Sequence, residues 1–319
     1  MKPSGAAGAA IPAAALALLA GCDPSGPQFG ADFPFFYLQD IDTDAPSPAC
    51  GFLGPYGDGL ACPGQRLLFI DGENGYVKAC PDLGYPLDHC ASTPEGGYGM
   101  AVSGELLMYV SNDTYLEHDP VLLPENGLFI VPKPSSTIAW VVCSGGVVAT
   151  VSTSTWTVAS VTDTPVEEPA AAAVTRDGAS LFIADAADGT VRKFNSSTME
   201  LQATEEVDGG ATDLSTSPSS GVYASPAGLS EIWHLDGGTG LHDFSIAIPG
   251  PAECIAATPD DAHLYAGGEG YGLVVVDRNG SLEAQTTSYG TPSDVVVRED
   301  GNRALVCAPD LLKVFVLSR

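Results

Sequence analysis

Basic residues are scarce in this chain. Its 319 residues include 12 Lys and Arg against 40 Asp and Glu, which gives a formal net charge of −28 at pH 7. Such an acidic surface repels nucleic-acid phosphates and argues against a nucleic-acid partner. We interpret the acidity mainly as a means of solubility, with recruitment of cations or of a basic partner as the alternative.

Helical periodicity and the common catalytic motifs are also missing. No stretch after residue 21 repeats its apolar residues at the 3.6-residue period of a helix, so an all-β fold is expected. The 37 Gly and 25 Pro suit a fold with many tight turns. The chain has no Gly-x-Ser-x-Gly elbow, no Ser-x-x-Lys, no phosphate loop and no Cys-x-x-Cys pair, and its five histidines lack metal-ligand spacing.

The N-terminal segment, 1–21, is predicted to be a secretory signal. Lys2 is the only charge before Asp23, and the apolar run between them is too short and too rich in alanine for a membrane-spanning helix. The run ends in Leu19-Ala20-Gly21-Cys22, which resembles the bacterial lipobox. The resemblance implies that Cys22 becomes a lipidated first residue and anchors the protein to a membrane of the bacterial envelope, facing the periplasm or the cell surface. An ordinary signal peptide with an incidental cysteine is the alternative. Residues 22–32 would then be a lipidated tether, and residues 33–319 a single domain.

A hairpin pattern recurs through this domain. The segment 176–195 predicts two short strands joined by a turn, and equivalent positions follow at intervals of 41, 42 and 40 residues: Leu181, Val222, Leu264 and Ala304. Further copies lie near Leu68, Leu107 and Trp140, although the last of these steps is clearly shorter than the others and predicts a trimmed second or third blade. Four short strands repeated at this period are typical of a β-propeller. We therefore predict a β-propeller of seven four-stranded antiparallel blades, with six or eight blades left open.

The first strand of each late repeat adds a family resemblance. The units PAAAAVTRDG, AECIAATPDD and PSDVVVREDG resemble the YVTN-family β-propeller repeat of bacterial surface and periplasmic proteins. The resemblance is good over residues 169–319 and partial over 65–161. It implies the fold but not a function, because propellers include scaffolds, binders and lactonase-like enzymes. The last repeat has only three strands, so we predict that residues 33–38 return to it as the outermost strand and close the ring.

Four cysteines cluster in the irregular first blade, about residues 45–95: Cys50, Cys62, Cys80 and Cys90. In an exported protein they predict two disulfides, and we favour Cys50–Cys62 and Cys80–Cys90 because each closes a short loop. A zinc site is the alternative. Cys143, Cys254 and Cys307 fall inside apolar strands, where we expect buried thiols.

Two groups of acids are candidate ligand sites. Asp40, Asp42 and Asp44 alternate along an extended segment, which indicates either a solvated strand end or a calcium site.

Asp213 and Asp294 occupy aligned positions at the mouth of the expected channel, with Glu253 next to the aligned Cys254. These three acids would hold Ca²⁺ or Mg²⁺ as a Lewis acid in a lactonase-like enzyme. The alternative is that each aspartate accepts hydrogen bonds from nearby backbone N–H groups.

The sequence therefore favours a lipid-anchored binding or scaffold module over an enzyme. Its partner would be an envelope protein or a small ligand, and the chain is expected to be a monomer. No cofactor is expected, with Ca²⁺ as the exception left open. The alternative function is a metal-dependent, lactonase-like hydrolase with an acidic site at the channel mouth.

Overall fold

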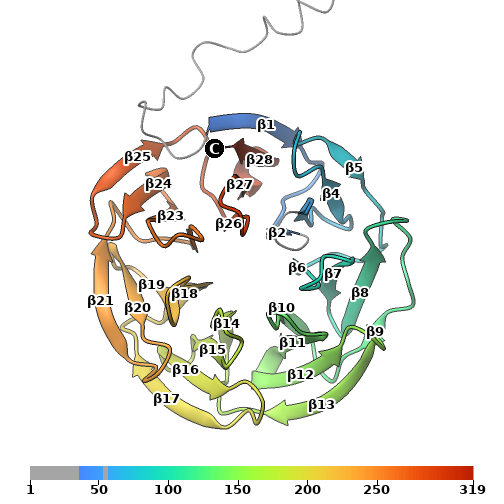
Figure 1. Ribbon diagram of the computed structural model, residues 1–319, viewed down its shortest axis with the longest axis horizontal. Helices are drawn as coiled ribbons and strands as arrows, with labels where there is room; N and C mark the ends of the chain where they lie inside the picture. The colour runs from blue at the N-terminus through green and yellow to red at the C-terminus, as the bar shows by residue number, and fades with distance from the viewer. Residues whose placement is uncertain (1–35, 53–56, 319) are drawn as a thin grey trace, which may run out of the picture.

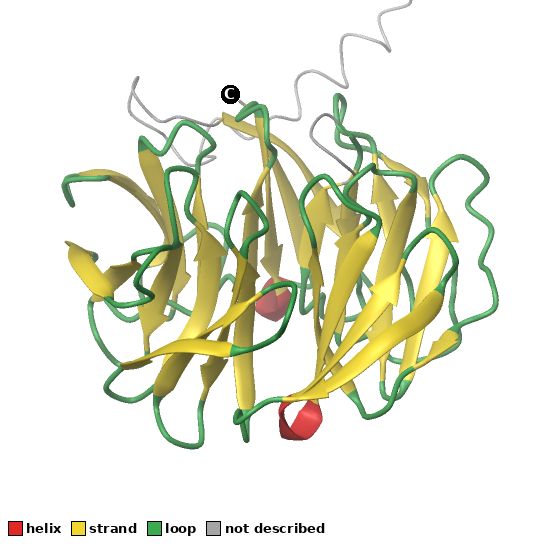
Figure 2. Cartoon of the chain, turned by 60° about the horizontal axis from the view of Figure 1, so that its bottom comes forward, coloured by secondary structure: helices red, strands yellow, loops and turns green. Residues whose placement is uncertain are grey.

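Seven four-stranded antiparallel sheets form a closed ring in the computed structural model (Figure 1). The structure describes residues 36–52 and 57–318, so the predicted signal peptide and tether lie outside the described residues. Within that part the only helical segments are two 3-10 turns, η1(Ser144–Gly146) and η2(Pro309–Leu311). Figure 2 shows the rest of the described chain as strands and loops. The predicted seven-bladed, all-β architecture is confirmed.

The blades follow one another in chain order, and the first strand of each lies innermost (Figure 1). Blades one and two consist of β2(Cys50–Phe52), β3(Gly59–Ala61), β4(Leu68–Ile70), β5(Val77–Ala79), β6(His89–Ser92), β7(Tyr98–Ser103), β8(Leu106–Ser111) and β9(Val121–Leu122). Blades three and four consist of β10(Gly127–Pro132), β11(Ile138–Cys143), β12(Val147–Ser152), β13(Thr157–Asp163), β14(Pro169–Val174), β15(Ser180–Asp185), β16(Thr190–Asn195) and β17(Leu201–Glu206). Blades five and six consist of β18(Ala211–Thr216), β19(Val222–Pro226), β20(Glu231–Leu235), β21(His242–Ala247), β22(Cys254–Ala257), β23(His263–Gly268), β24(Gly272–Asp277) and β25(Leu282–Thr286). Blade seven consists of β26(Asp294–Val297), β27(Arg303–Ala308), β28(Lys313–Ser318) and, from the other end of the domain, β1(Phe36–Asp42).

The blade period is more regular than the sequence predicted. Trp140 and the four later markers lie in second strands, but Leu68 and Leu107 lie in the third strands β4 and β8. The second strands themselves begin at nearly equal intervals, at Gly59, Tyr98, Ile138, Ser180, Val222, His263 and Arg303. The prediction of a trimmed blade is therefore wrong: the short step between Leu107 and Trp140 came from comparing a third strand with a second one.

The ring closes as predicted, by pairing of the first strand with the last. β1 runs antiparallel to β28, with Ile41 opposite Val314 and Asp42 opposite Lys313. Ile41 is buried in a cluster that includes Val314 and Leu305 of blade seven and Leu68 of blade one. This pairing satisfies the backbone groups that the last blade would otherwise leave exposed at its edge. Residues 33–35 of the predicted closing segment lie outside the described part.

The core consists of apolar layers between neighbouring blades. All six residues of β15 are buried, whereas the outer strand β17 alternates between exposed and half-buried residues. Inner strands lose their alternation because each blade has a neighbour on both faces. No helix in the described residues is of a length and apolarity that would cross a membrane.

Candidate functional site

The innermost strand of every blade lies nearest the centre of the ring (Figure 1). Asp213 lies on β18 of blade five and Asp294 begins β26 of blade seven. Both side chains are half-buried. The aligned repeat positions therefore do place these two aspartates on innermost strands, as expected.

Each of these carboxylates connects two blades. The Asp213 Oδ2 accepts a hydrogen bond from the backbone N–H of Ile255 on β22 at 2.8 Å, and its Oδ1 accepts one from Leu214 at 2.7 Å. The Asp294 Oδ2 accepts a hydrogen bond from the backbone N–H of Cys50 on β2 at 2.7 Å. Blade five is thereby joined to blade six, and blade seven to blade one. This arrangement matches the backbone-capping alternative for these residues.

The same surroundings raise the pKa values of both carboxyl groups. Burial, and then repulsion by Asp294, raises the pKa of Asp213 to about 8. Burial raises the pKa of Asp294 to about 6, against the opposing effect of the hydrogen bond from Cys50. Removing a carboxylate from water disfavours its charged form, and a nearby like charge disfavours it further. At neutral pH the pair therefore carries less than two full negative charges.

Glu253 does not complete a three-acid site with them. It is exposed, and its backbone N–H donates to the Gly267 oxygen at 2.7 Å. Within residues 36–52 and 57–318, no group of three or more His, Cys, Asp and Glu side chains is arranged to hold a metal ion.

The acidic segment after residue 39 forms ion pairs. The Asp40 carboxylate contacts the Lys313 ammonium, and the Asp42 Oδ1 lies 3.5 Å from the same Nζ. The Asp44 Oδ2 lies 2.9 Å from the Arg66 Nη1. Asp40 and Asp42 thus contact Lys313 on the neighbouring strand β28, and Asp44 contacts Arg66 of blade one. They do not converge on one point.

The cysteines are arranged differently from the prediction. All seven cysteines in the described part are free thiols, so neither Cys50–Cys62 nor Cys80–Cys90 is bonded. Cys80 is exposed, whereas Cys90 is buried on β6 of the next blade. The short-loop argument failed because it took no account of which strands the fold brings together. Cys22, the predicted lipidation site, lies outside the described residues.

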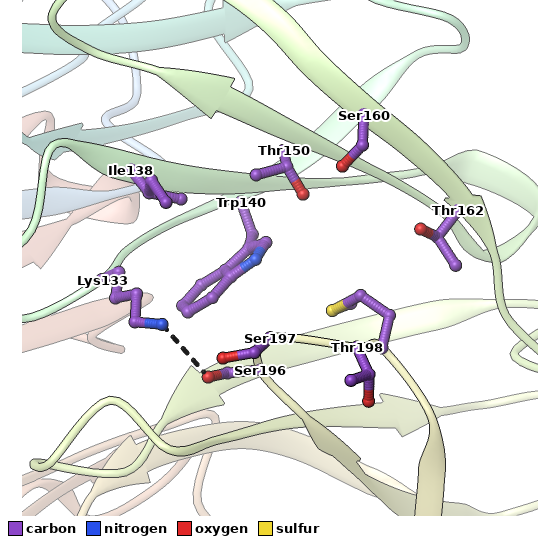
Figure 3. Close-up of a pocket in the computed structure, with 10 residues that line it drawn as sticks. Lys133, Ile138, Trp140, Thr150, Ser160, Thr162, Ser196, Ser197 and Thr198 are labelled. Carbon is purple, nitrogen blue, oxygen red and sulfur yellow. Dashed lines mark hydrogen bonds between the residues drawn. The ribbon is translucent and has the colours of Figure 1, made fainter.

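A rim pocket between blades three and four was not predicted. It has a volume of about 350 Å³ and is lined by the turn between β10 and β11, by residues of β11 to β13 and by the turn after β16 (Figure 3). Six of its side chains carry hydroxyl groups: Thr150, Ser160, Thr162, Ser196, Ser197 and Thr198. The sequence signal was faint, because Ser160 and Thr162 follow the alternation common to outer strands and Ser196 to Thr198 form an ordinary turn.

Lys133 is the one charged residue among the described residues that line this rim pocket. Its ammonium lies 3.4 Å from the Ser196 hydroxyl and 5.4 Å from the centre of the Trp140 ring (Figure 3). Of the ten basic residues in the described part, seven form ion pairs with carboxylates, and Arg176 and Lys193 donate to backbone carbonyls. Lys133 alone among them has neither partner. It therefore keeps donor capacity for a bound molecule.

Solved structures share the ring but little sequence. A chain of the "Crystal Structure of Mitotic Checkpoint Complex" superposes with a TM-score of 0.78 at 10% identity, over 93% of this chain and 94% of that one. A chain of Kuenenia stuttgartiensis hydrazine synthase superposes with a TM-score of 0.72 at 15% identity, over 88% of this chain and 97% of that one. Identities this low establish the propeller fold alone. No family model and no curated protein matches the sequence.

Proposed function

We propose that this protein is an exported, lipid-anchored β-propeller that acts as a binding module, with the rim pocket as its ligand site. The observation that carries the proposal is the Lys133 ammonium, which has no carboxylate or carbonyl partner among the described residues and lies among hydroxyl groups. A rigid ring of seven blades suits this role, because its strands fix the pocket residues before any ligand arrives.

The chemistry of the rim pocket favours a neutral, polyhydroxylated ligand such as a small carbohydrate. Serine and threonine hydroxyls both donate and accept hydrogen bonds, as sugar hydroxyls do, and the ammonium adds three donors. The net charge of −28 opposes the approach of anions. A volume of about 350 Å³ is near the lower end for ligand pockets, which fits one or two sugar rings.

A thermal-shift screen of the whole chain tests this ligand class. Neutral mono- and disaccharides should raise the melting temperature, and Lys133→Met should weaken their binding by about tenfold or more, since a hydrogen bond from a charged donor is lost. Lys78→Met is the matched control, because Lys78 is paired with Asp58 at 2.8 Å on blade one. Binding of inorganic phosphate in preference to neutral sugars, or equal loss in both variants, would contradict the assignment.

The predicted membrane anchor supports this role by holding the propeller in the envelope. The Leu19-Ala20-Gly21-Cys22 sequence resembles a lipobox, and burial of several acyl chains gives lasting attachment, at about 0.8 kcal/mol per CH₂. Cys22→Ser should move the protein from the membrane fraction to the soluble fraction after export. Continued membrane association of this variant would show that the anchor is not the Cys22 lipid.

A metal-dependent, lactonase-like hydrolase remains the second candidate function. Its supporting observation is that Asp213 and Asp294 interact electrostatically on innermost strands of the ring. Their oxygens already accept backbone hydrogen bonds, which is why we rank binding first. A calcium titration decides between them: a site of millimolar affinity or better that Asp294→Asn abolishes would favour the hydrolase, and no shift in melting temperature would remove its basis.

A further inference from the structure

The rim pocket lies at a position that recurs in every blade. At one register position a third-strand residue lies opposite a large apolar residue of the second strand, and in blade three this residue is Thr150, opposite Trp140. The equivalent residues of the other blades are Phe69, Tyr109, Lys193, His234, Val275 and Val316. These six are at most 9% exposed, whereas Thr150 is half-buried. Blade three is therefore the exception among seven equivalent positions.

Between blades two and three the equivalent space is filled by stacked rings. Tyr109 takes the place of Thr150 there. His118 follows in the same cross-strand row, where blade three has Ser160. The Tyr109 ring stacks on Trp156 of blade three, with centroids 3.5 Å apart and planes at 6°, and on His118, with centroids 5.0 Å apart and planes at 2°. Three parallel rings therefore occupy this gap.

The turns that cover the two gaps are built alike. The Trp156 N–H donates to the Ser152 oxygen, four residues back, at 2.8 Å. The Met199 N–H donates in the same way to the Asn195 oxygen at 2.7 Å. Both fifth residues have a left-handed φ, 54° for Trp156 and 57° for Met199. Each turn thus brings its fifth residue against the preceding blade, Trp156 onto Tyr109 and Met199 into the lining of the rim pocket.

Two further gaps are filled by other side chains. Between blades four and five, the stem of Lys193 packs against Gly240, where an added Cβ would lie 3.0 Å from the Lys193 Cδ. Between blades five and six, His234 stacks on Phe244 with ring centroids 4.7 Å apart. The Arg278 guanidinium lies 5.4 Å from the centre of the same Phe244 ring. The rim pocket therefore results from the small side chains of one row in blade three, and not from the way in which the blades pack.

We propose that Thr150 and Ser160 are the specificity-determining residues of the rim pocket, and that they admit one flat sugar ring edge-on between blades three and four. This inference rests on the binding role proposed above. Figure 3 shows the two side chains on neighbouring strands, in the row where blade two has parallel rings. A pyranose ring suits this space, because its hydroxyl groups lie at the ring edge and find hydroxyl partners and the Lys133 ammonium. Its C–H faces are apolar and match the adaptable Met199 side chain.

A double variant tests these two positions by introducing the rings of blade two. Thr150→Tyr with Ser160→His should fill the pocket and leave Lys133 in place. We expect the affinity for neutral monosaccharides in calorimetric titrations to fall by about tenfold or more, since the ligand must displace both rings. Val161→Tyr is the control, because Val161 is 50% exposed on the same strand and does not line the pocket. Equal binding by wild type and the double variant would overturn the proposal.

Oxidation of Met199 tests the open space without any ligand. Met100 and Met108 are fully buried, so Met199 is the most accessible methionine of the described part. Hydrogen peroxide converts methionine to its sulfoxide, which mass spectrometry of the Met199 peptide measures. The double variant should slow this reaction several-fold, and an unchanged rate would overturn the proposal. Slower oxidation together with no sugar binding by wild type would contradict the proposed function alone and support the roles of Thr150 and Ser160.

The reverse exchange gives a test that does not depend on the folding of the double variant. Tyr109→Thr with His118→Ser should open an equivalent cavity between blades two and three. We expect stronger quenching of Trp156 fluorescence by acrylamide, while sugar binding at the rim pocket stays as in wild type. Unchanged quenching would show that the side chains of this row do not decide whether a gap is open, and the proposal would fall.

Discussion

The Asp213 and Asp294 carboxyls make the folded state less stable as the pH rises. Their pKa values in the folded protein are about 8 and about 6, against 3.8 for an ordinary aspartate. The stability that these groups contribute is fully present below pH 4, where both states are protonated. Above about pH 4 the unfolded chain has released these protons, whereas in the folded protein Asp294 retains its proton up to about pH 6 and Asp213 up to about pH 8. The free energy of unfolding from this pair therefore falls between about pH 4 and 8.

Asp294→Asn should reduce this loss of stability. The asparagine Oδ1 is able to accept the same hydrogen bond from Cys50, but the charge that repels Asp213 is gone. We expect the pKa of Asp213 to fall below 8, and the stability of the variant relative to wild type to increase from pH 4 to pH 8. Carboxyl NMR titration of Asp213 and urea unfolding at several pH values measure both effects.

An exposed aspartate supplies the control for this experiment. Asp113→Asn removes one negative charge from the surface of blade two. Its stability difference from wild type should stay nearly constant over the same pH range. A constant difference for Asp294→Asn as well would show that the pKa of Asp294 is not raised in the folded protein, and an unchanged titration of Asp213 would show that the two carboxyls do not interact.

Sequence alignment was able to place these two aspartates but not their partners. Repeat alignment identifies residues at the same position of each blade, which is why Asp213 and Asp294 were expected on innermost strands. The N–H groups of Ile255 and Cys50 belong to the next blade around the ring. Which strand lies beside another is a property of the closed ring.

At the scale of elements, the closing strand β1 should stabilise the whole domain. Ile41 is 7% exposed and packs against side chains of blades seven and one. Ile41→Ala removes three methyl or methylene groups from that layer and should lower the free energy of unfolding by about 2–5 kcal/mol. Guanidinium unfolding followed by tryptophan fluorescence measures the change.

Leu38→Ala is the matched control on the same strand. The Leu38 side chain is 38% exposed, so its truncation leaves a smaller loss of buried area. We expect a change well below that of Ile41→Ala. Equal effects of the two variants would mean that β1 does not stabilise the ring through its buried face.

The strands of blades one and two show why their order was misread. Their second strands include Gly59–Ala61 and Tyr98–Ser103, which are short or contain glycine. Their third strands carry the stronger apolar runs, Leu68–Ile70 and Leu106–Ser111. A hydrophobic run predicts a buried strand but does not give its position within a blade. The length of the repeat was therefore easier to predict than the position of each strand within its blade.

At the scale of the whole molecule, several contacts stabilise the junction of blades seven and one. β1 pairs with β28, and the Asp294 carboxylate accepts a hydrogen bond from the backbone N–H of Cys50. The Arg298 guanidinium is 3% exposed, pairs with Asp300 at 2.7 Å and donates to the Gly72 oxygen of blade one at 3.0 Å. A ring whose two ends did not hold together would expose the edges of two blades.

The net charge of −28 predicts that salt stabilises the fold. Like charges repel more strongly in the compact state than in the unfolded chain, and salt screens that repulsion over about 10 Å at 0.1 M. Raising NaCl from about 10 mM to 500 mM should therefore increase the melting temperature, in contrast to a protein whose stability depends mainly on surface ion pairs. Calorimetry at constant pH measures the shift.

Calcium chloride at equal ionic strength separates screening from specific binding. If screening alone acts, the two salts should give similar shifts, apart from the stronger effect of a divalent ion near any acidic surface. A larger calcium shift that saturates, and that Asp294→Asn removes, would instead indicate a bound ion between Asp213 and Asp294. A saturating shift that the variant leaves intact would locate the ion elsewhere, with Asp40, Asp42 and Asp44 as the next acids to replace. A melting temperature that falls with NaCl would show that the ion pairs formed by seven of the basic residues outweigh the repulsion among the acids.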